Sequence, residues 1–261
     1  MKIAVVTTFN KKLYDQYAHN FLKSYFTNWP FDLYVYSEET FPVSIEKGNE
    51  HRLTLRNIFK EYPECKAFVD RNKDKPIAPP PGFENYHPNY KEFRHEAVRF
   101  SYKVYSYIHF VLTCKGYDGV ICIDADSVFF KKVDENWFIE NDIIKNDTMM
   151  TYMGRGKTYH MEAGFLYFNL KHKETKNFLK EMKRWYDKDL MYTVPEQHDS
   201  YIWDIVREQF EEKGVINNDI GDGRVGHVQA RSALGTIYDH VKGNKPKKRG
   251  YSEENIHRRK I

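Results

Sequence analysis

Short apolar runs separated by longer segments with helical spacing are the most regular pattern in the chain. Residues 3–7 and 119–123 are continuous or nearly continuous apolar runs, which are typical of strands buried on both faces of a sheet. Residues 31–36 alternate as a second strand, whereas residues 13–25 and about 90–112 repeat apolar positions every three to four residues and predict helices. Strands and helices in alternation predict an α/β fold.

The second half of the chain continues this alternation. We expect strands at 148–153 and 164–169, helices at 171–190 and 200–210, and a short strand at 215–217. The sheet should therefore be mixed but mainly parallel, with helices on its faces.

Proline interrupts the pattern in two places. Residues 53–69 have helical spacing with a break at Pro63, and Pro79-Pro80-Pro81-Gly82 cannot continue a helix or a central strand. We expect a surface loop over about residues 73–90, within one domain that spans residues 1–239.

Composition places the chain among soluble proteins. Its 261 residues suffice for a sizeable core, and no run approaches the roughly 18 apolar residues of a membrane span. Residues 1–6 form a strand pattern rather than a secretion signal, so we expect a cytoplasmic protein, in the host cytoplasm if it is viral. Three cysteines without zinc-type spacing predict reduced, buried thiols.

The net charge of +4 is mild, but its distribution is uneven. Residues 240–261 form a basic C-terminal segment in which only Glu253 and Glu254 oppose a concentration of cations. The cations are Lys242, Lys245, Lys247, Lys248, Arg249, Arg258, Arg259 and Lys260.

Two carboxylates directly follow the apolar run at 119–123. Asp124 and Asp126 stand at i and i+2, at the end of a strand where α/β proteins bind ligands. Such a pair repels itself unless a hard cation such as Mn²⁺ or Mg²⁺ lies between the carboxylates, usually together with a phosphate-bearing substrate. Asp187 and Asp189 have the same spacing but end a charged helical pattern, so we interpret them as a solvated helix end.

Other polar residues are candidates for contact with a substrate. Thr7 and Thr8 form the turn after the first strand, and Arg94 and Lys103 lie in the helical segment before the Asp-x-Asp strand. These four residues could contact a nucleotide diphosphate. For the cations, the alternative is an exposed charge on an apolar stem.

Acid or base candidates lie in or near apolar segments. Glu162 and Asp199 are the first candidates, and Asp204, His198 and His227 are further ones. A structural hydrogen bond or ion pair is the alternative role for each.

The chain resembles the metal-dependent glycosyltransferases of the GT-A fold, most of all the family 8 type and its small viral relatives. The resemblance rests on segments spread over most of the sequence. Three of them are Val5-Val6-Thr7-Thr8, residues 94–103 and Asp124-Ala125-Asp126. Residues 162–169 resemble the family's Asn-x-Gly-…-Phe-Asn strand with Glu162 in place of the asparagine, and Glu196-Gln197-His198-Asp199 resembles its Asp-Gln-Asp segment with one residue inserted. Residues 240–246 are one residue shorter than the family's His-x-x-Gly-x-x-Lys-Pro.

This resemblance implies roles for the C-terminal motif. His240 would be the third protein ligand of a Mn²⁺ or Mg²⁺ ion held by Asp124 and Asp126, and Gly243 and Lys245 would close over the diphosphate of a nucleotide-sugar, with UDP-sugar favoured. The segment 240–261 would thus complete the metal and diphosphate site.

The acceptor hydroxyl has several interpretations. The ending Asp239-His240-Val241-Lys242-Gly243 resembles phage-type and oxygenase-associated transferases that modify hydroxymethylated pyrimidines in DNA. With the basic tail, this resemblance predicts duplex DNA as a partner and a steep salt dependence. The alternative acceptor is a glycan or lipopolysaccharide. A non-catalytic nucleotide-sugar or nucleic-acid binding protein, and a nucleotidyltransferase or phosphodiesterase, are alternatives of other classes.

Overall fold

A mixed, mainly parallel sheet of seven strands forms the centre of the molecule. The computed structural model describes residues 1–84, 92–156, 159–243, 247 and 250–255. The strand order is β3-β2-β1-β4-β7-β6-β8, in which β7 runs antiparallel to both of its neighbours and the other pairs are parallel. The strands are β1 (Ile3–Thr8), β2 (Asp32–Ser37), β3 (Leu53–Asn57), β4 (Gly119–Ile123), β6 (Met150–Met153), β7 (Glu162–Asn169) and β8 (Asn218–Asp219).

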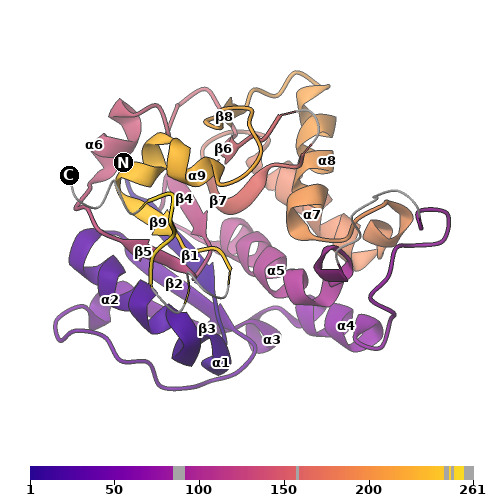
Figure 1. The fold of residues 1–261 in the computed structure, drawn as a ribbon, viewed down its shortest axis with the longest axis horizontal. Coiled ribbons are helices and arrows are strands. Elements are labelled where there is room, and N and C mark those ends of the chain that lie inside the picture. Colours follow the sequence, from indigo (N-terminus) through magenta and orange to yellow (C-terminus); the bar gives the residue numbers. More distant parts are fainter. Residues whose placement is uncertain (85–91, 157–158, 244–246, 248–249, 256–261) are drawn as a thin grey trace.

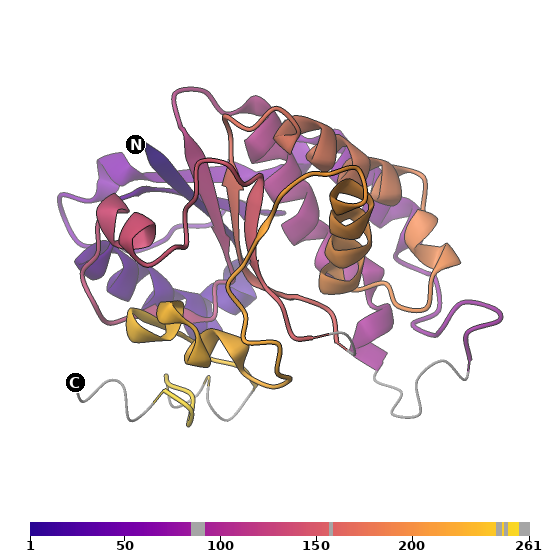
Figure 2. The same ribbon diagram turned by 90° about the horizontal axis from the view of Figure 1, so that it is seen from above.

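Two helical layers cover the faces of this sheet (Figures 1 and 2). One layer holds α3 (Ile58–Glu61), α4 (Pro63–Asn72), α5 (Ala97–Thr113), α7 (Thr175–Asp187) and α8 (Asp199–Glu211). The opposite side holds α1 (Lys11–Leu13), a π-helical turn (Tyr14–Ala18), α2 (His19–Asn28), α6 (Glu135–Glu140) and α9 (Val228–Arg231). The fold class and its single-domain α/β architecture agree with the expectation from the sequence.

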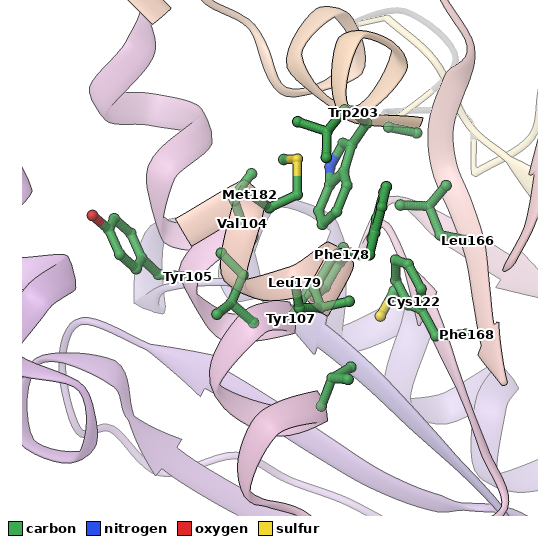
Figure 3. Close-up of a cluster of buried hydrophobic side chains, with 14 of the residues drawn as sticks. Val104, Tyr105, Tyr107, Cys122, Leu166, Phe168, Phe178, Leu179, Met182 and Trp203 are labelled. Atoms are coloured by element: carbon green, nitrogen blue, oxygen red, sulfur yellow. The ribbon is translucent and has the colours of Figure 1, made fainter. Parts of the chain in front are cut away.

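Alternate residues of the central strands supply two separate cores. In β4, Val120 and Cys122 pack with α5, α7 and α8, whereas Ile121 and Ile123 pack with α2 and α6. Figure 3 shows part of the first core, where Trp203 of α8 and Phe178 of α7 lie over Phe168 of β7. Side chains of a strand point alternately to its two faces, so a continuous apolar run is what a strand covered on both sides requires.

A second, two-stranded sheet joins distant parts of the chain. β5 (Ser127–Phe129) follows the Asp-x-Asp turn and pairs antiparallel with β9 (Tyr238–His240), with Ser127 opposite His240. This pairing brings the C-terminal histidine to the end of β4.

The expected helix at 53–69 is wrong over its first part. Residues 53–57 form the edge strand β3, whose backbone pairs in parallel with β2 so that Leu53 lies opposite Leu33 and Leu55 opposite Val35. Asn57 then caps α3 by accepting a hydrogen bond from the Lys60 amide, 3.0 Å away. Pro63 is the first residue of α4, so the expected break is present.

Other boundaries also differ from the sequence expectation. The long helix begins at Ala97, after a 3₁₀ turn at Glu92–His95, and the short late strand lies at Asn218–Asp219 rather than at 215–217. The described part of the proline-rich segment, through Glu84, has no helix or strand, as expected, and residues 85–91 lie outside the described residues. The remaining 3₁₀ turns are Glu50–Arg52, Leu190–Thr193 and Ala233–Thr236.

The three cysteines follow the expectation from the sequence in part. All three cysteines are free thiols, with Cys65 and Cys122 buried and Cys114 half-buried. Throughout the described ranges, every helix is too short or too polar to cross a membrane.

Candidate functional site at the carboxyl ends of the strands

Asp124, Asp126 and His240 converge at the end of β4. Their ligand atoms all lie within 4.8 Å of one another. His240 Nε2 is 3.1 Å from Asp126 Oδ1 and 3.6 Å from Asp124 Oδ2. The three residues predicted as metal ligands are therefore neighbours, although more than a hundred residues separate the histidine from the carboxylates in the sequence.

Backbone hydrogen bonds fix this arrangement. The Asp124 amide donates to the carbonyl of Gly164 on β7 at 3.1 Å, and the Val241 amide donates to the carbonyl of Asp126 at 2.8 Å. Gly164 also leaves room for the imidazole, since a Cβ at this position would lie 2.5 Å from His240 Cε1 and Nδ1. The glycine in the strand at 162–169 thus has a structural reason.

Lysines neutralise the carboxylates of this site. Lys103 of α5 reaches both Asp124 (2.6 Å) and Asp199 (2.8 Å), and Lys247 Nζ lies 2.7 Å from Asp126 Oδ2. Lys242 forms an ion pair with Glu162. Buried carboxylates need such partners, because an unpaired charge out of water is costly.

These partners determine the protonation states. Burial would raise the pKa of Asp126, but His240 and Lys247 outweigh it and hold that pKa well below its usual range. Burial likewise opposes the ionisation of Glu162, yet Lys242, His240 and Arg155 lower its pKa to about 2. Burial raises the pKa of Asp124 against the opposing effects of Lys103 and His240. Asp126 and Glu162 are therefore carboxylates at neutral pH.

The donor set fits a divalent metal ion. Two carboxylates and one imidazole are ligands that Mn²⁺ accepts, and they leave coordination positions for other oxygens. His240 Nδ1 is buried without a hydrogen-bond partner, and Glu162 Oε1 is 4.0 Å from it. The described residues hold a second histidine and carboxylate group, formed by His160, Glu196 and His198.

The second group is a hydrogen-bond network rather than a matching ligand set. His198 Nδ1 accepts from the Tyr201 amide at 3.3 Å as the N-cap of α8, so the neutral ring carries its proton on Nε2, which lies 2.7 Å from Glu196 Oε2. That nitrogen has no lone pair left for a metal. Arg94 Nη1, 2.5 Å away, occupies the other oxygen of Glu196.

A cavity of about 580 Å³ lies at the carboxyl ends of β1 and β2. Thr8, Asn10, Glu38, Arg99 and Tyr102 are among its lining residues. The size suits a nucleoside, and the location is the one where open α/β sheets bind ligands.

The other predicted residues are distributed as follows. Thr7 is fully buried and does not line the cavity, and Arg94 pairs with Glu196. Gly243 has a φ of +83°, which favours glycine. Lys245 lies outside the described residues.

The remaining acid and base candidates have structural partners. Asp204 accepts from the Met161 amide at 2.8 Å and from Arg207 Nε at 3.0 Å. His227 is buried, with its ring centroid 6.1 Å from that of His240. The other Asp-x-Asp pair is structural, since Asp187 binds Tyr105 and Asp189 binds Arg71.

Sequence reasoning missed three cations of the site. Lys242 and Lys247 belong to the basic C-terminal segment but were not assigned to the carboxylates, and Arg155 lies 3.3 Å from Glu162. For Lys242 and Lys247 the only signal is positive charge in or near the C-terminal histidine motif, and Arg155 has no signal of its own, because ion pairs set by the tertiary fold have no periodicity.

Comparison with known proteins gives a match at the level of structure alone. No family model matches the sequence, and no curated protein sequence matches it significantly. The structure matches that of mouse xyloside xylosyltransferase 1 with a TM-score of 0.50 and 10% identity, over 85% of this chain and 86% of that one. The chain has a GT-A glycosyltransferase fold.

Two further matches are weaker. The galactosyltransferase LgtC, solved with donor and acceptor sugar analogues, gives a TM-score of 0.45 and 14% identity, over 82% of this chain and 72% of that one. A glycosyltransferase involved in glycosylation of the PBCV-1 major capsid also gives 0.45, with 12% identity over 100% of both chains.

Proposed function

We propose that this protein is a metal-dependent glycosyltransferase that moves a sugar from a nucleotide-diphosphate donor to a hydroxyl acceptor. The observation that carries the proposal is the convergence of Asp124, Asp126 and His240 beside a nucleoside-sized cavity on a glycosyltransferase fold. A binding module has no need of this ligand set.

The proposed donor site extends along the carboxyl edge of the sheet. The nucleoside lies in the cavity lined by Thr8, Arg99 and Tyr102, where the tyrosine ring offers a face for the base. Asp124, Asp126 and His240 hold Mn²⁺ or Mg²⁺, which supplies Lewis-acid charge for the departing diphosphate when bound. We favour a UDP-sugar as the donor.

Positive side chains around the carboxylates support the diphosphate end of this site. Lys247 lies on Asp126, and Lys103 lies on Asp124, so both can approach the oxygens of a diphosphate. We assign Gly243 to the close approach of the backbone to that group, since its φ is positive.

Glu162 and Asp199 are our candidates for the sugar end. Glu162 is buried beside His240, and its low pKa of about 2 keeps it anionic. An anionic carboxylate can accept hydrogen bonds from sugar hydroxyls or stabilise positive charge at the anomeric carbon, but it cannot serve as an acid at neutral pH. Asp199, which forms an ion pair with Lys103 at 2.8 Å, is the second candidate.

The first experiment measures Mn²⁺-dependent release of nucleotide from a panel of UDP- and GDP-sugars. We expect turnover that Asp126→Ala reduces by about 100-fold or more, because it removes a metal ligand. Asp70→Ala is the matched control, since Asp70 is an exposed carboxylate that forms a surface ion pair with Lys66. An Asp126→Ala variant as active as the unaltered protein would contradict the proposal, and absence of turnover with every donor would favour a non-catalytic nucleotide-sugar binding protein.

The same assay includes duplex DNA with 5-hydroxymethylcytosine or 5-hydroxymethyluracil. Sugar found on the base would establish the DNA acceptor expected from the basic C-terminal segment. Donor hydrolysis indifferent to DNA would leave a glycan as the acceptor.

A further inference from the structure

A second large cavity lies on the other side of the metal-ligand cluster, the group formed by Asp124, Asp126 and His240. It has a volume of about 650 Å³ and is lined by residues 152, 154–156 and 159–161, by one face of α8 between residues 201 and 208, and by Asp219. No sequence motif pointed to it, and its lining shares no residue with the cavity at β1 and β2.

The strand order relates the two cavities to the proposed reaction centre. The carboxyl ends of β1, β2, β4, β6 and β8, together with the start of the antiparallel β7, all lie along one edge of the sheet. From β2 to β8, this edge presents the 580 Å³ cavity, then the metal-ligand cluster at β4 and β7, and then the 650 Å³ cavity at β6 and β8. The metal-ligand cluster therefore lies between two cavities.

Arg155 connects the second cavity to the reaction centre. It lines the cavity and donates to the carbonyls of His160 (2.6 Å) and Met161 (3.1 Å) and to the carboxylate of Glu162 (3.3 Å). The wall of the cavity and the carboxylate beside His240 are thus consecutive residues held by one guanidinium group.

The chemistry of the lining indicates the class of ligand. Among the described lining residues, Asp204, Glu208 and Asp219 contribute three carboxylates against the two guanidinium groups of Arg155 and Arg207, and these guanidinium groups are already paired with carboxylates. A lining with this balance does not attract a polyanion, because phosphate backbones need unpaired cations. Carboxylates and backbone groups in a polar cavity instead suit the many hydroxyl groups of a saccharide.

Aromatic rings complete the cavity. Tyr152, Tyr159 and Tyr201 all line it, and Tyr159 keeps 43% of its surface exposed. The His160 ring is held against Tyr201 at 4.4 Å between centroids, and His160 Nε2 is 3.6 Å from the buried Glu196. An exposed tyrosine face beside fixed polar groups matches the two surfaces of a sugar ring, whose C–H face is apolar and whose edge is polar.

We infer that this cavity is the acceptor subsite and that the acceptor is an uncharged carbohydrate. The inference rests on the proposed glycosyltransferase function, with the donor nucleoside in the cavity at β1 and β2. The acceptor hydroxyl then enters from the β6 and β8 side and meets the sugar near Glu162.

The test compares transfer with donor hydrolysis in Tyr159→Ala. The probes are p-nitrophenyl hexosides and pentosides and the disaccharides lactose, maltose and cellobiose. We expect transfer to at least one saccharide, with an acceptor KM about tenfold higher in Tyr159→Ala, as loss of one stacked ring predicts. Donor hydrolysis without acceptor is measured in the same variant, so that the change in acceptor KM is separated from any change in the donor reaction.

Tyr192→Ala is the matched control, because Tyr192 is a partly exposed tyrosine that lines neither cavity. Tyr192→Ala should change neither the acceptor KM nor the rate of donor hydrolysis. An acceptor KM unaffected by Tyr159→Ala, or transfer to hydroxymethylated DNA alone, would overturn the inference.

Direct binding separates failure of this inference from failure of the proposed function. If no donor is turned over, saturation-transfer NMR with the same saccharides still reports on the cavity. Saccharide binding that Tyr159→Ala abolishes would support the carbohydrate site without the transferase activity, and lack of binding to every saccharide would overturn it.

Discussion

At the residue scale, Gly164 sets the position of the His240 imidazole, the proposed third metal ligand. Its missing side chain leaves the space that His240 occupies, and its carbonyl accepts the amide of Asp124. Gly164 thereby determines the positions of both His240 and Asp124.

We therefore predict that Gly164→Ala weakens Mn²⁺ binding by about tenfold to 100-fold, the range that follows when ligand orientation is lost. The added Cβ would lie 2.5 Å from the ring of His240, so the ring must move. Isothermal titration calorimetry with Mn²⁺ measures the effect. In a His240→Ala background, Gly164→Ala should change the affinity for Mn²⁺ little. An equal loss of Mn²⁺ affinity in both backgrounds would rule out the contact with the His240 ring as the cause.

Glu162 gives a pH-dependent contribution to stability. Its pKa is lowered from 4.5 to about 2 in the folded protein, so its contribution is present above about pH 4.5 and is lost as the pH falls through 2. We predict that the unaltered protein loses up to about 3 kcal/mol more unfolding free energy than Glu162→Gln between pH 5 and pH 2. Urea unfolding at a series of pH values measures this difference, and equal losses in both proteins would contradict it.

At the scale of elements, the C-terminal segment after β9 brings cations onto the acidic site. Lys242 reaches Glu162, and Lys247 reaches Asp126 while lying 4.6 Å from the ring centroid of Tyr17. Lys247 and a metal ion would both interact with the same carboxylate.

This competition predicts effects of opposite sign for one substitution. Lys247→Ala should tighten Mn²⁺ binding by about threefold to tenfold, because a cation no longer opposes the ion, and should weaken UDP binding by a similar factor. Calorimetric titrations with Mn²⁺ alone and with UDP in the presence of Mn²⁺ measure the two effects. Lys66→Ala, which removes an exposed pair with Asp70, should change neither, and a change of the same sign in both titrations would contradict the prediction.

The sequence predicted the elements that repeat apolar residues often enough to show a period. β1, β4, α5, α7 and α8 fall in this class, because each buries several side chains in a regular order. β5 and β9 have three residues each, and β3 is an exposed edge whose Leu55 is 47% exposed, so periodicity says little about them.

The same limit applies to the site. Asp124 and Asp126 were found from the strand that ends before them, and His240 only through resemblance to a known motif. Lys247 and Arg155 depend on tertiary contacts alone. The second cavity has no local signature either, because its described lining comes from residues 152–156 and 159–161, from α8 and from Asp219.

At the scale of the whole molecule, the proposed sites for the donor nucleotide and the metal are neighbours on one edge of the sheet. The proposed nucleoside cavity lies at β1 and β2, and the metal-ligand cluster lies at the next strand, β4. A diphosphate that contacts both would couple the two binding events.

We predict that UDP and Mn²⁺ together raise the melting temperature by more than the sum of their separate effects. At 100 times the Kd, a ligand adds about 2.7 kcal/mol, which for a protein of this size corresponds to about 5 to 10 °C. Differential scanning fluorimetry measures the shifts. Asp126→Ala should abolish the excess, and additive shifts in the unaltered protein would contradict the coupling.

The alternation within β4 has a consequence for the evolution of this fold. Val120 and Cys122 face one core, while Ile121 and Ile123 face the other. Substitutions at neighbouring positions therefore contact different side chains, and their effects on stability should be almost independent. Each position of β4 must be apolar, but the choice of apolar residue is less restricted, because cores tolerate exchanges that conserve volume. A lineage can thus replace most of both cores and keep the strand ends in place, which accords with a shared fold at 10% identity.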